Sequence, residues 1–343
     1  MKKTFGFILL LAWVLFLKGP GASYGQEVIK LKMADPFPVG HLQHELGLRL
    51  IEAIHQFTNQ RVKIEYYPSE QLGKAKDLLY LCSQGLADIS YVHIPYFAGQ
   101  LPLNVVGILP FFTTAVEGTE IYARLVNTSP EVTQEFQKYG TRVISVCITP
   151  QYDIGTVKKQ VIGPADVRGL KLKTAGGIYD RIAQRYGIIP VNVAGAETYE
   201  AVQRGIVEGV VFSYPSIKGY RLNEILKYYT FGLRMGGFPQ AYIINEKTWQ
   251  KLPGDIQKAL LKAGQTNEIY SPGEAWDREQ RRLAKMFEKE GMVIYDIKPE
   301  DKEKWFPLLK GVEDGWMDDL EKKGLPGKKV FNDFKKICQE VTK

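Results

Sequence analysis

The chain has 343 residues, of which 45% are hydrophobic and 24% are charged, with a formal net charge of +7. This length predicts about two domains, and the composition is that of a folded globular protein. Disorder, collagen-like repeats and a protein with many membrane spans are therefore excluded. Three scattered cysteines (Cys82, Cys147 and Cys338) are too few for a disulfide framework or a zinc site, so we expect buried thiols and at most one disulfide.

Residues 1–25 have the pattern of a secretory signal peptide. Lys2 and Lys3 precede an apolar run over residues 5–17, and small residues near position 25 offer a cleavage site. An uncleaved anchor helix is the alternative, but the run is short for a bilayer and residues 18–21 end it early. Because this segment holds three lysines and no acid, its removal would leave a net charge of +4. We therefore expect a secreted protein that does not bind nucleic acid.

Strands and helices alternate along the next part of the chain. Alternating apolar residues predict strands over 28–34, 62–66 and 88–92, and helical spacing predicts helices over 41–56, 78–84 and 117–139. The apolar stretch 102–112 is predicted to be a loop. The pattern restarts after a strand at 143–148, where residues 150–152 (PQY) form a crossover.

The second half repeats the same arrangement. Strands are predicted over 169–174, 189–193, 209–212, 241–245 and 293–295, and helices over 177–186 and 197–206. These βαβ-sized units predict a parallel or mixed sheet covered by helices. Residues 254–290 are helical in pattern apart from Pro272-Gly273, which is typical of a divided helix that bridges two lobes. No flexible linker is present, so ordered crossovers would act as hinges.

Sequence motifs of catalysis are missing. We find no Gly-rich phosphate loop, no Cys-x-x-Cys, no His-Glu-x-x-His and no Gly-x-Ser-x-Gly. His41 and His44 could face one way on a helix, but no carboxylate accompanies them at ligand spacing, so we interpret them as helix-start or surface histidines. We expect no cofactor, no metal and no enzymatic activity. The alternative is a secreted α/β hydrolase or lyase acting on a small acid.

Four stretches resemble the extracytoplasmic solute-binding subunit of tripartite ATP-independent periplasmic (TRAP) transporters. Residues 67–73 (YPSEQLG) are similar to the family's YP-x-x-QLG stretch, followed by Gly-x-Ala-Asp-Ile at 85–89. Residues 166–171 (DVRGLK) are similar to its DLKGLK stretch, and 197–209 (ETYEAVQRGIVEG) to its E-x-Y-x-ALQ-x-G-x-VDG helix. The long helix before the C-terminus is similar as well. We interpret most of stretch 197–209 as architecture, including Tyr199, Gln203 and Glu208.

The resemblance also shows where this chain departs from the family. The strand after GLK usually carries an arginine that binds a substrate carboxylate with two parallel hydrogen bonds, and here Lys173 occupies that position. Lysine keeps the charge but lacks the planar guanidinium fork. A polar asparagine and a second arginine are also usual, where this chain has residues 212–214 (FSY) and 150–153 (PQYD). The resemblance therefore implies an altered acid pocket.

Two interpretations of Lys173 follow. It is either a solvated strand lysine, with another cation holding the acid, or it binds a monocarboxylate with an apolar or aromatic body. We favour the second, since aromatic pockets select flat or apolar ligands. The ligand-binding residues predicted in this half are Lys173, Gln151, Tyr152, Phe212 and Tyr214.

The first half should supply the opposite wall, because loops after strand ends line crevices in such sheets. The candidates there are Phe37, His41, Gln71, Tyr91 and His93. Tyr91 and His93 could instead pack beneath the first sheet. No residue replacing the family's arginine other than Lys173 can be named from the sequence.

The sequence therefore predicts an α/β, two-lobed periplasmic-binding-protein (Venus-flytrap) fold with a long interlobe helix. Lobe one would comprise residues 27–149 and 240–280, and lobe two residues 150–239 and 281–343. A small organic acid would bind between the lobes, favour the closed form and be delivered to TRAP membrane permease subunits. A sensor receptor or an ABC-type permease is the alternative partner. The resemblance implies a periplasmic location.

Overall fold

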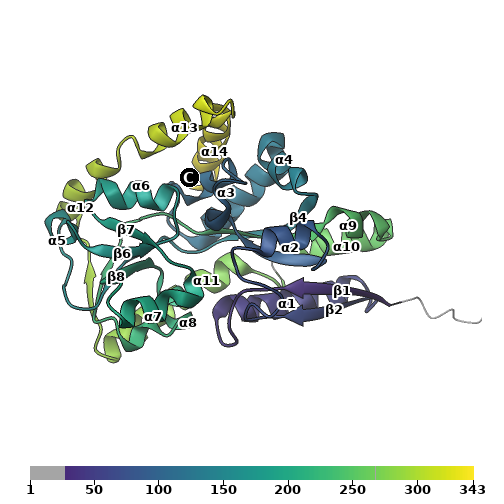
Figure 1. Cartoon of the computed structure of the whole chain (residues 1–343), viewed down its shortest axis with the longest axis horizontal. Helices are drawn as coiled ribbons and strands as arrows, with labels where there is room; N and C mark the ends of the chain where they lie inside the picture. The colour runs from purple at the N-terminus through teal and green to yellow at the C-terminus, as the bar shows by residue number, and fades with distance from the viewer. Residues whose placement is uncertain (1–27, 267) are drawn as a thin grey trace, which may run out of the picture.

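Two mixed β-sheets form the framework of the protein in the computed structural model, which describes residues 28–266 and 268–343 (Figure 1). The signal peptide expected over residues 1–25 lies outside the described residues. The first sheet has the order β2-β1-β3-β10-β4 and the second has the order β11-β9-β5-β8-β6-β7. Helix α11 (Pro272–Lys289) lies between the two sheets in Figure 1.

The first sheet combines four early strands with one late strand. It contains β1 (Ile29–Ala34), β2 (Val62–Tyr67), β3 (Ile89–His93), β4 (Thr141–Ile148) and β10 (Pro239–Asn245). Strand β1 pairs in parallel with β2 and β3, whereas β10 runs antiparallel between β3 and β4. The return of the chain through β10 inserts a segment from beyond residue 238 into the first sheet.

The second sheet is built from the middle of the chain. It contains β5 (Asp153–Thr156), β6 (Lys171–Thr174), β7 (Ile189–Asn192), β8 (Gly209–Phe212), β9 (Tyr228–Phe231) and β11 (Val293–Asp296). Strand β6 lies in parallel between β7 and β8, and β5 runs antiparallel to β8 and β9. The prediction of parallel or mixed sheets is confirmed in its mixed form. The short strands β5 and β9 were absent from the sequence prediction.

Fourteen α-helices surround the sheets within the described residues. They are α1 (Leu42–Phe57), α2 (Leu78–Ser83), α3 (Ala115–Thr128), α4 (Pro130–Lys138), α5 (Pro164–Val167), α6 (Ile178–Arg185), α7 (Thr198–Gln203), α8 (Tyr214–Gly219), α9 (Glu246–Lys251), α10 (Gly254–Gln265), α11, α12 (Pro299–Trp305), α13 (Val312–Lys322) and α14 (Gly327–Val341). Five short 3₁₀ turns accompany them: η1 (Ile94–Phe97), η2 (Asn104–Ile108), η3 (Gly195–Glu197), η4 (Leu222–Glu224) and η5 (Phe306–Leu309).

Two of the predicted helix boundaries are wrong, and proline explains both. The single helix expected over 117–139 is divided into α3 and α4, because Pro130 lacks the amide hydrogen that a continuing helix needs and instead begins α4. The expected break at Pro272-Gly273 falls earlier, between α10 and α11. Pro272 is the first residue of α11, a position that proline favours.

Helix α11 connects the two halves through its packing. Its Trp276 is buried in the core beneath the first sheet, whereas Leu283 and Phe287 are buried in a second core that includes residues of the second sheet. The Asp277 carboxylate accepts the first amides of α3, and Gln280 Oε1 accepts the Tyr214 amide at the start of α8 (3.0 Å). The bridging helix expected from the sequence is therefore present as α11.

The two crossovers between the sheets run side by side. The Tyr152 amide donates to the Gly236 carbonyl (2.8 Å), and the Met235 amide donates to the Tyr152 carbonyl (2.8 Å). They therefore form a short ordered ribbon rather than a loose linker. At the C-terminus, α13 packs against α6 and α14 packs against α3, so this segment contacts elements of both halves. The lobe boundaries given above stay a prediction.

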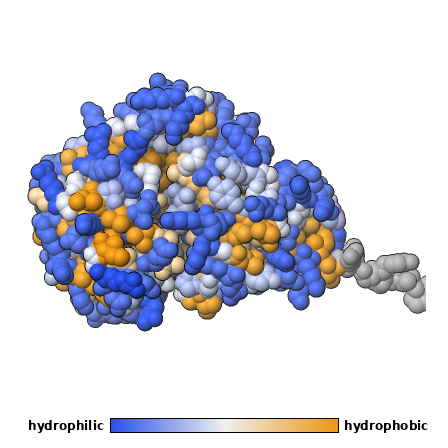
Figure 2. All heavy atoms as spheres, in the orientation of Figure 1, coloured by the Kyte–Doolittle hydropathy of each residue, from blue (hydrophilic) through white to orange (hydrophobic). Residues whose placement is uncertain are grey.

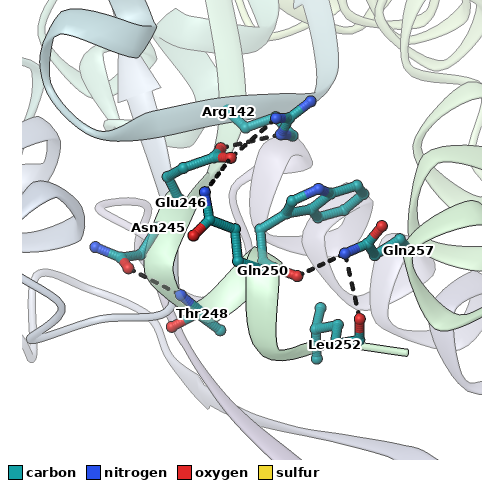
Figure 3. A network of polar contacts seen from close by, with 8 residues as sticks. Arg142, Asn245, Glu246, Thr248, Gln250, Leu252 and Gln257 are labelled. Carbon is teal, nitrogen blue, oxygen red and sulfur yellow. Dashed lines mark hydrogen bonds and ion pairs between the residues drawn. The ribbon is translucent and has the colours of Figure 1, made fainter. Parts of the chain in front are cut away.

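A polar network fixes the point where β10 leaves the first sheet (Figure 3). Arg142 on β4 makes two 3.0 Å hydrogen bonds to Glu246 at the start of α9 and lies over the Trp249 ring. Asn245 caps α9 by accepting the Thr248 amide (3.0 Å), and Gln257 donates to the Trp249 carbonyl (2.8 Å). The end of β10 is thereby anchored, which also fixes the cavity residues at its beginning.

The face drawn in Figure 2 is mostly hydrophilic, with groups of apolar residues between hydrophilic ones. Over residues 28–266 and 268–343, no helix combines the length and apolar character that a membrane span requires.

Candidate functional site

A small cavity of about 20 Å³ lies between the two sheets. Residues after strand ends and around the crossovers line it, as expected for open α/β sheets. The first-sheet side supplies Phe37, His93, Tyr96, Thr149, Phe238 and Gln240; the second-sheet side supplies Tyr152, Gly195, Phe212, Ser216 and Tyr220; α11 supplies Trp276. The walls are mainly aromatic and contain no carboxylate.

Lys173 lies against this cavity on β6. Its side chain is 0% exposed, and its ammonium has no hydrogen-bond partner. The ammonium lies 3.9 Å from the centroid of the Phe212 ring, which lines the cavity, although Lys173 itself is not a lining residue. Burial, and then the charge of Lys76, lower the pKa of Lys173 to about 7. The interpretation of Lys173 as a solvated strand lysine is therefore wrong.

A buried ammonium without a partner is costly, because it loses its hydration and gains no counter-charge. The cation–π contact with Phe212 offsets part of that cost. Among the described residues, no arginine lines the cavity. Lys173 is thus a concentrated positive charge that an anionic group entering the cavity would stabilise.

Two histidines add hydrogen-bonding capacity on the other side. Both ring nitrogens of His93 are buried without a partner. His41 accepts the Gln43 amide at Nδ1 (3.0 Å) as the N-cap of α1, so the proton of its neutral ring lies on Nε2, which also has no partner. Burial lowers the pKa of each histidine to about 3, and the charge of Lys173 contributes for His93. Both rings are therefore neutral N–H donors.

The loop that carries Phe37 is held by the YPSEQLG stretch. The Asp35 carboxylate accepts the Phe37 amide (2.9 Å) and the Tyr242 hydroxyl (2.8 Å), and the Phe37 carbonyl accepts the Ser69 amide (2.9 Å). Ser69 and Glu70 both adopt positive φ (56° and 60°), which forms the tight turn that brings their amides to this loop. This stretch therefore positions the first-sheet wall of the cavity.

Four of the predicted site residues line the cavity: Phe37, His93, Tyr152 and Phe212. His41 lies directly behind it, stacked on Phe37 with ring centroids 4.3 Å apart and also near the Tyr220 ring. Together with Lys173, these residues come from both sheets and meet in one place.

The other four predicted residues lie elsewhere. Tyr91 is buried within the first sheet, with its hydroxyl 3.1 Å from Cys147 Sγ, and Tyr214 packs on Tyr229 and Phe287 beside α11. Gln151 uses its amide to bind the Gly236 amide and the Phe112 carbonyl in the crossover. Gln71 is exposed and does not line the cavity. Their direct contact with a ligand is not supported by this geometry.

Sequence reasoning missed several wall residues, notably Tyr220, Phe238, Gln240 and Trp276. They come from α8, the second crossover, β10 and α11, which are far apart along the chain. Tyr96 lies three residues after the predicted His93, so the aromatic character of that stretch was a local signal for it. The remaining residues carry no local signal. Their neighbours in the sequence do not indicate which strands come to lie side by side when the chain returns to the first sheet through β10.

The 197–209 stretch has the structural role expected of it. Its Glu208 accepts the Lys171 amide (3.0 Å) and donates its own amide to the Lys171 carbonyl (2.8 Å), which joins the end of this stretch to β6. The three cysteines are buried and free. Across the described residues, no group of three or more His, Cys, Asp or Glu side chains could hold a metal ion.

Two sheets joined by ordered crossovers, with an enclosed cavity between them, define a two-lobed solute-binding protein. The family model described as "Bacterial extracellular solute-binding protein, family 7" (DctP) matches residues 33–316. The chain belongs to this family, to which the extracytoplasmic solute-binding subunits of TRAP transporters belong. It is accordingly a binding protein and not an enzyme.

Individual relatives agree with this assignment. A solute-binding protein of Albidiferax ferrireducens is 24% identical over 299 residues, covering 84% of this chain and 86% of the relative. The structure of a TRAP solute-binding protein from Rhodoferax ferrireducens with copurified benzoate is similar with a TM-score of 0.85, at 19% identity, over 92% of this chain and 99% of that one. A TRAP binding protein from Bordetella bronchiseptica with bound (R)- and (S)-mandelate has a TM-score of 0.82, at 22% identity, over 91% and 99%.

Proposed function

We propose that this protein captures a small monocarboxylate with an aromatic or apolar body. The observation that carries the proposal is Lys173, a fully buried ammonium without a hydrogen-bond partner beside a cavity whose walls contain no acid. A carboxylate is the small anionic group that would satisfy this ammonium with a charge-assisted hydrogen bond. To bind the ligand's carboxylate, the Lys173 ammonium has to leave its contact with the Phe212 ring.

The walls support an aromatic or apolar body. Tyr152 stacks on Phe238 with ring centroids 5.6 Å apart, and Phe212 stacks on Tyr220 at 5.8 Å. A flat apolar ligand gains buried surface against such rings without leaving polar groups unpaired. In this conformation the cavity of about 20 Å³ has room for about one water molecule, so binding of an acid requires its walls to move apart, as in a hinge-type opening of two lobes.

The relatives supply further support for the ligand class. The two proteins of the same fold described above hold benzoate and mandelate, and each ligand joins one carboxylate to an aromatic body. We extend this class to the present chain because of Lys173 and the aromatic walls.

We also infer that residues 1–25 direct the protein to the periplasm, where the ligand-bound form would deliver its acid to TRAP permease subunits. Cleavage would leave Gln26 as the first residue. Intact mass measurement of the protein recovered from the periplasm after expression of the full sequence tests this processing. Retention of residues 1–25 in a membrane-bound product would contradict it.

The ligand class is tested by native mass spectrometry of the purified protein, followed by denaturation and identification of any released small molecule. A thermal-shift panel then compares benzoate, phenylacetate and mandelate with succinate and glucuronate at equal concentration. We expect the aromatic monocarboxylates to raise the melting temperature and the other two acids to leave it unchanged. Stabilisation by succinate or glucuronate, without any by the aromatic acids, would overturn the proposal.

A further inference from the structure

A pair of polar side chains on the first-sheet wall carries atoms without hydrogen-bond partners at the cavity. His93 on β3 and Gln240 on β10 are directly opposite each other in the antiparallel register. Residues opposite each other in such a pair point to the same face of the sheet, with Cβ atoms about 4.5–5.5 Å apart. Both residues line the cavity. The two side chains therefore form one polar patch in an otherwise aromatic wall.

The free atom of Gln240 is an acceptor. Its Nε2 donates to the Phe238 carbonyl (3.4 Å), and a carbonyl can only accept, so the amide is oriented with Oε1 away from Phe238. Gln240 is 1% exposed, and Oε1 has no donor within hydrogen-bond distance. Buried amide oxygens are normally paired, so this one points to a donor supplied by another molecule.

His93 adds the complementary capacity. Its two ring nitrogens are both unpartnered, and a neutral imidazole offers one donor and one acceptor. A hydroxyl group satisfies both residues at once, because it can donate to Gln240 Oε1 and accept from the His93 N–H. An ionised carboxylate cannot donate a hydrogen bond, and an unsubstituted aromatic ring neither donates nor accepts one in this way.

Aromatic side chains enclose this patch. The His93 ring lies 5.0 Å from Phe37, 5.1 Å from Tyr96 and 5.4 Å from Phe238, measured between ring centroids. The group that presents the hydroxyl must therefore itself fit between rings. Lys173 reaches the cavity from the second sheet, so the charged and the neutral polar contacts come from opposite walls.

We propose that the ligand is a hydroxylated aromatic acid, whose hydroxyl group is bound by Gln240 and His93 while its carboxylate is bound by Lys173. This inference rests on the proposed function and adds a specificity determinant to it. Gln240 discriminates between ligands because an acid without the hydroxyl leaves its buried oxygen unpaired.

Isothermal titration calorimetry with matched acids tests the inference. The set consists of benzoate, 3-hydroxybenzoate, 4-hydroxybenzoate and 3-methoxybenzoate, which keeps the oxygen but cannot donate. We expect the better hydroxybenzoate to bind at least about tenfold more tightly than benzoate and 3-methoxybenzoate. Gln240→Met removes the acceptor at similar side-chain length, so it should reduce this preference to within about twofold. Lys171→Met, at an exposed position of β6 that does not line the cavity, should keep the preference.

The outcomes separate the two levels of the proposal. If no acid in the set binds, the proposed function fails. If benzoate binds as tightly as both hydroxybenzoates, a water molecule satisfies Gln240, and the inference is overturned while the ligand class stands. A preference that survives Gln240→Met in a folded variant also overturns it. Should that variant fail to fold, the comparison among acids in the unmodified protein still decides.

Discussion

The two halves of the molecule contain the same local unit with different side chains at one buried strand position. In the first half, α2 is followed by Gly85 at φ 74°, and the carboxylate of Asp88 accepts the Lys32 amide of β1 (2.8 Å). In the second half, α7 is followed by Gly205 at φ 71°, and the carboxylate of Glu208 accepts the Lys171 amide of β6 (3.0 Å).

Lys32 and Lys171 hold equivalent places in the two units. The residues two positions further along each strand can therefore be compared directly. In β1 this position is Ala34, and in β6 it is Lys173; both are buried. The same backbone arrangement therefore carries a methyl group in one half and the unpaired ammonium in the other. The comparison teaches that the glycine and the acid form the same framework in both halves, whereas the buried residue that follows on the strand differs between them.

Substitution of Lys173 should have the largest effect on ligand affinity, because this residue distinguishes the two halves. Lys173→Met removes the charge while keeping an apolar stem, and we expect aromatic acid binding to weaken by roughly 1.5–3 kcal/mol, the range for hydrogen bonds to charged groups. The ligand-free variant should melt at a higher temperature, since an uncompensated buried charge is removed.

Titration calorimetry and thermal unfolding measure the two effects of Lys173→Met. Lys171→Met is the matched control, because Lys171 lies on the same strand and is exposed. Unchanged affinity, or a loss of ligand-free stability, would assign Lys173 a purely structural role.

Gly219 allows a close approach between the halves. A Cβ built at Gly219 on α8 would lie 1.9 Å from Cδ2 of His41, which caps α1 in the other half. Gly219→Ala should therefore hold the two halves apart and weaken binding by about tenfold, typical of overpacking. Small-angle scattering should show a smaller radius of gyration on ligand addition for the unmodified protein and less compaction for the variant.

Gly254→Ala is the control for Gly219→Ala, because a Cβ at Gly254 meets no atom within 4 Å. Equal compaction of both variants would refute a role for this contact in closure.

Ligand affinity should fall with rising pH, because the proposed carboxylate contact depends on the protonated Lys173 of the second half. Burial, and then the positive charge of Lys76, lower the pKa of Lys173 to about 7, while Asp180 opposes this shift. A bound carboxylate favours the ammonium, so binding above pH 7 takes up a proton, and affinity should fall by up to about tenfold per pH unit. Calorimetry in buffers of different ionisation enthalpy measures this proton uptake.

Stability of the ligand-free protein should change in the opposite direction. Between pH 7 and 10.5 the unfolded chain keeps Lys173 protonated while the folded chain does not, so its contribution to stability rises with pH across this window. Lys173→Met should remove both dependences. A pH-independent affinity between pH 6 and 9 in the unmodified protein would contradict the assignment.

The framework acids should show the smallest effect in both halves. Asp88→Asn and Glu208→Gln each weaken the hydrogen bond from a strand amide, so we expect each to lower the free energy of unfolding by about 1 kcal/mol. Asp88 also accepts the Thr248 hydroxyl (2.8 Å), so its effect should be the larger of the two. Urea unfolding measures this change, and ligand affinity should stay the same. A loss of affinity in Glu208→Gln alone would show that the two units are not equivalent in function.

Much of the framework was predictable because it depends on local patterns. Alternation of apolar residues located β1, β2 and β8, and the helical repeat located α1 and α6. The position of Lys173 followed from a motif within one strand, and a separate stretch led to Phe212 as a residue of the same predicted site. Short strands such as β5 and β9 were missed, since four residues hold too little periodicity to be distinguished from a loop.

The sequence by itself determined the succession of strands and helices and the place of Lys173 on a strand of the second half. Only the tertiary structure decided that Lys173 is buried and unpaired, that Gln71, Gln151 and Tyr214 lie away from the cavity, and that Gln240 enters it. Burial and partner choice depend on contacts between segments distant along the chain. The insertion of β10 beside β3 creates the His93–Gln240 pair, and no local pattern specifies that neighbour.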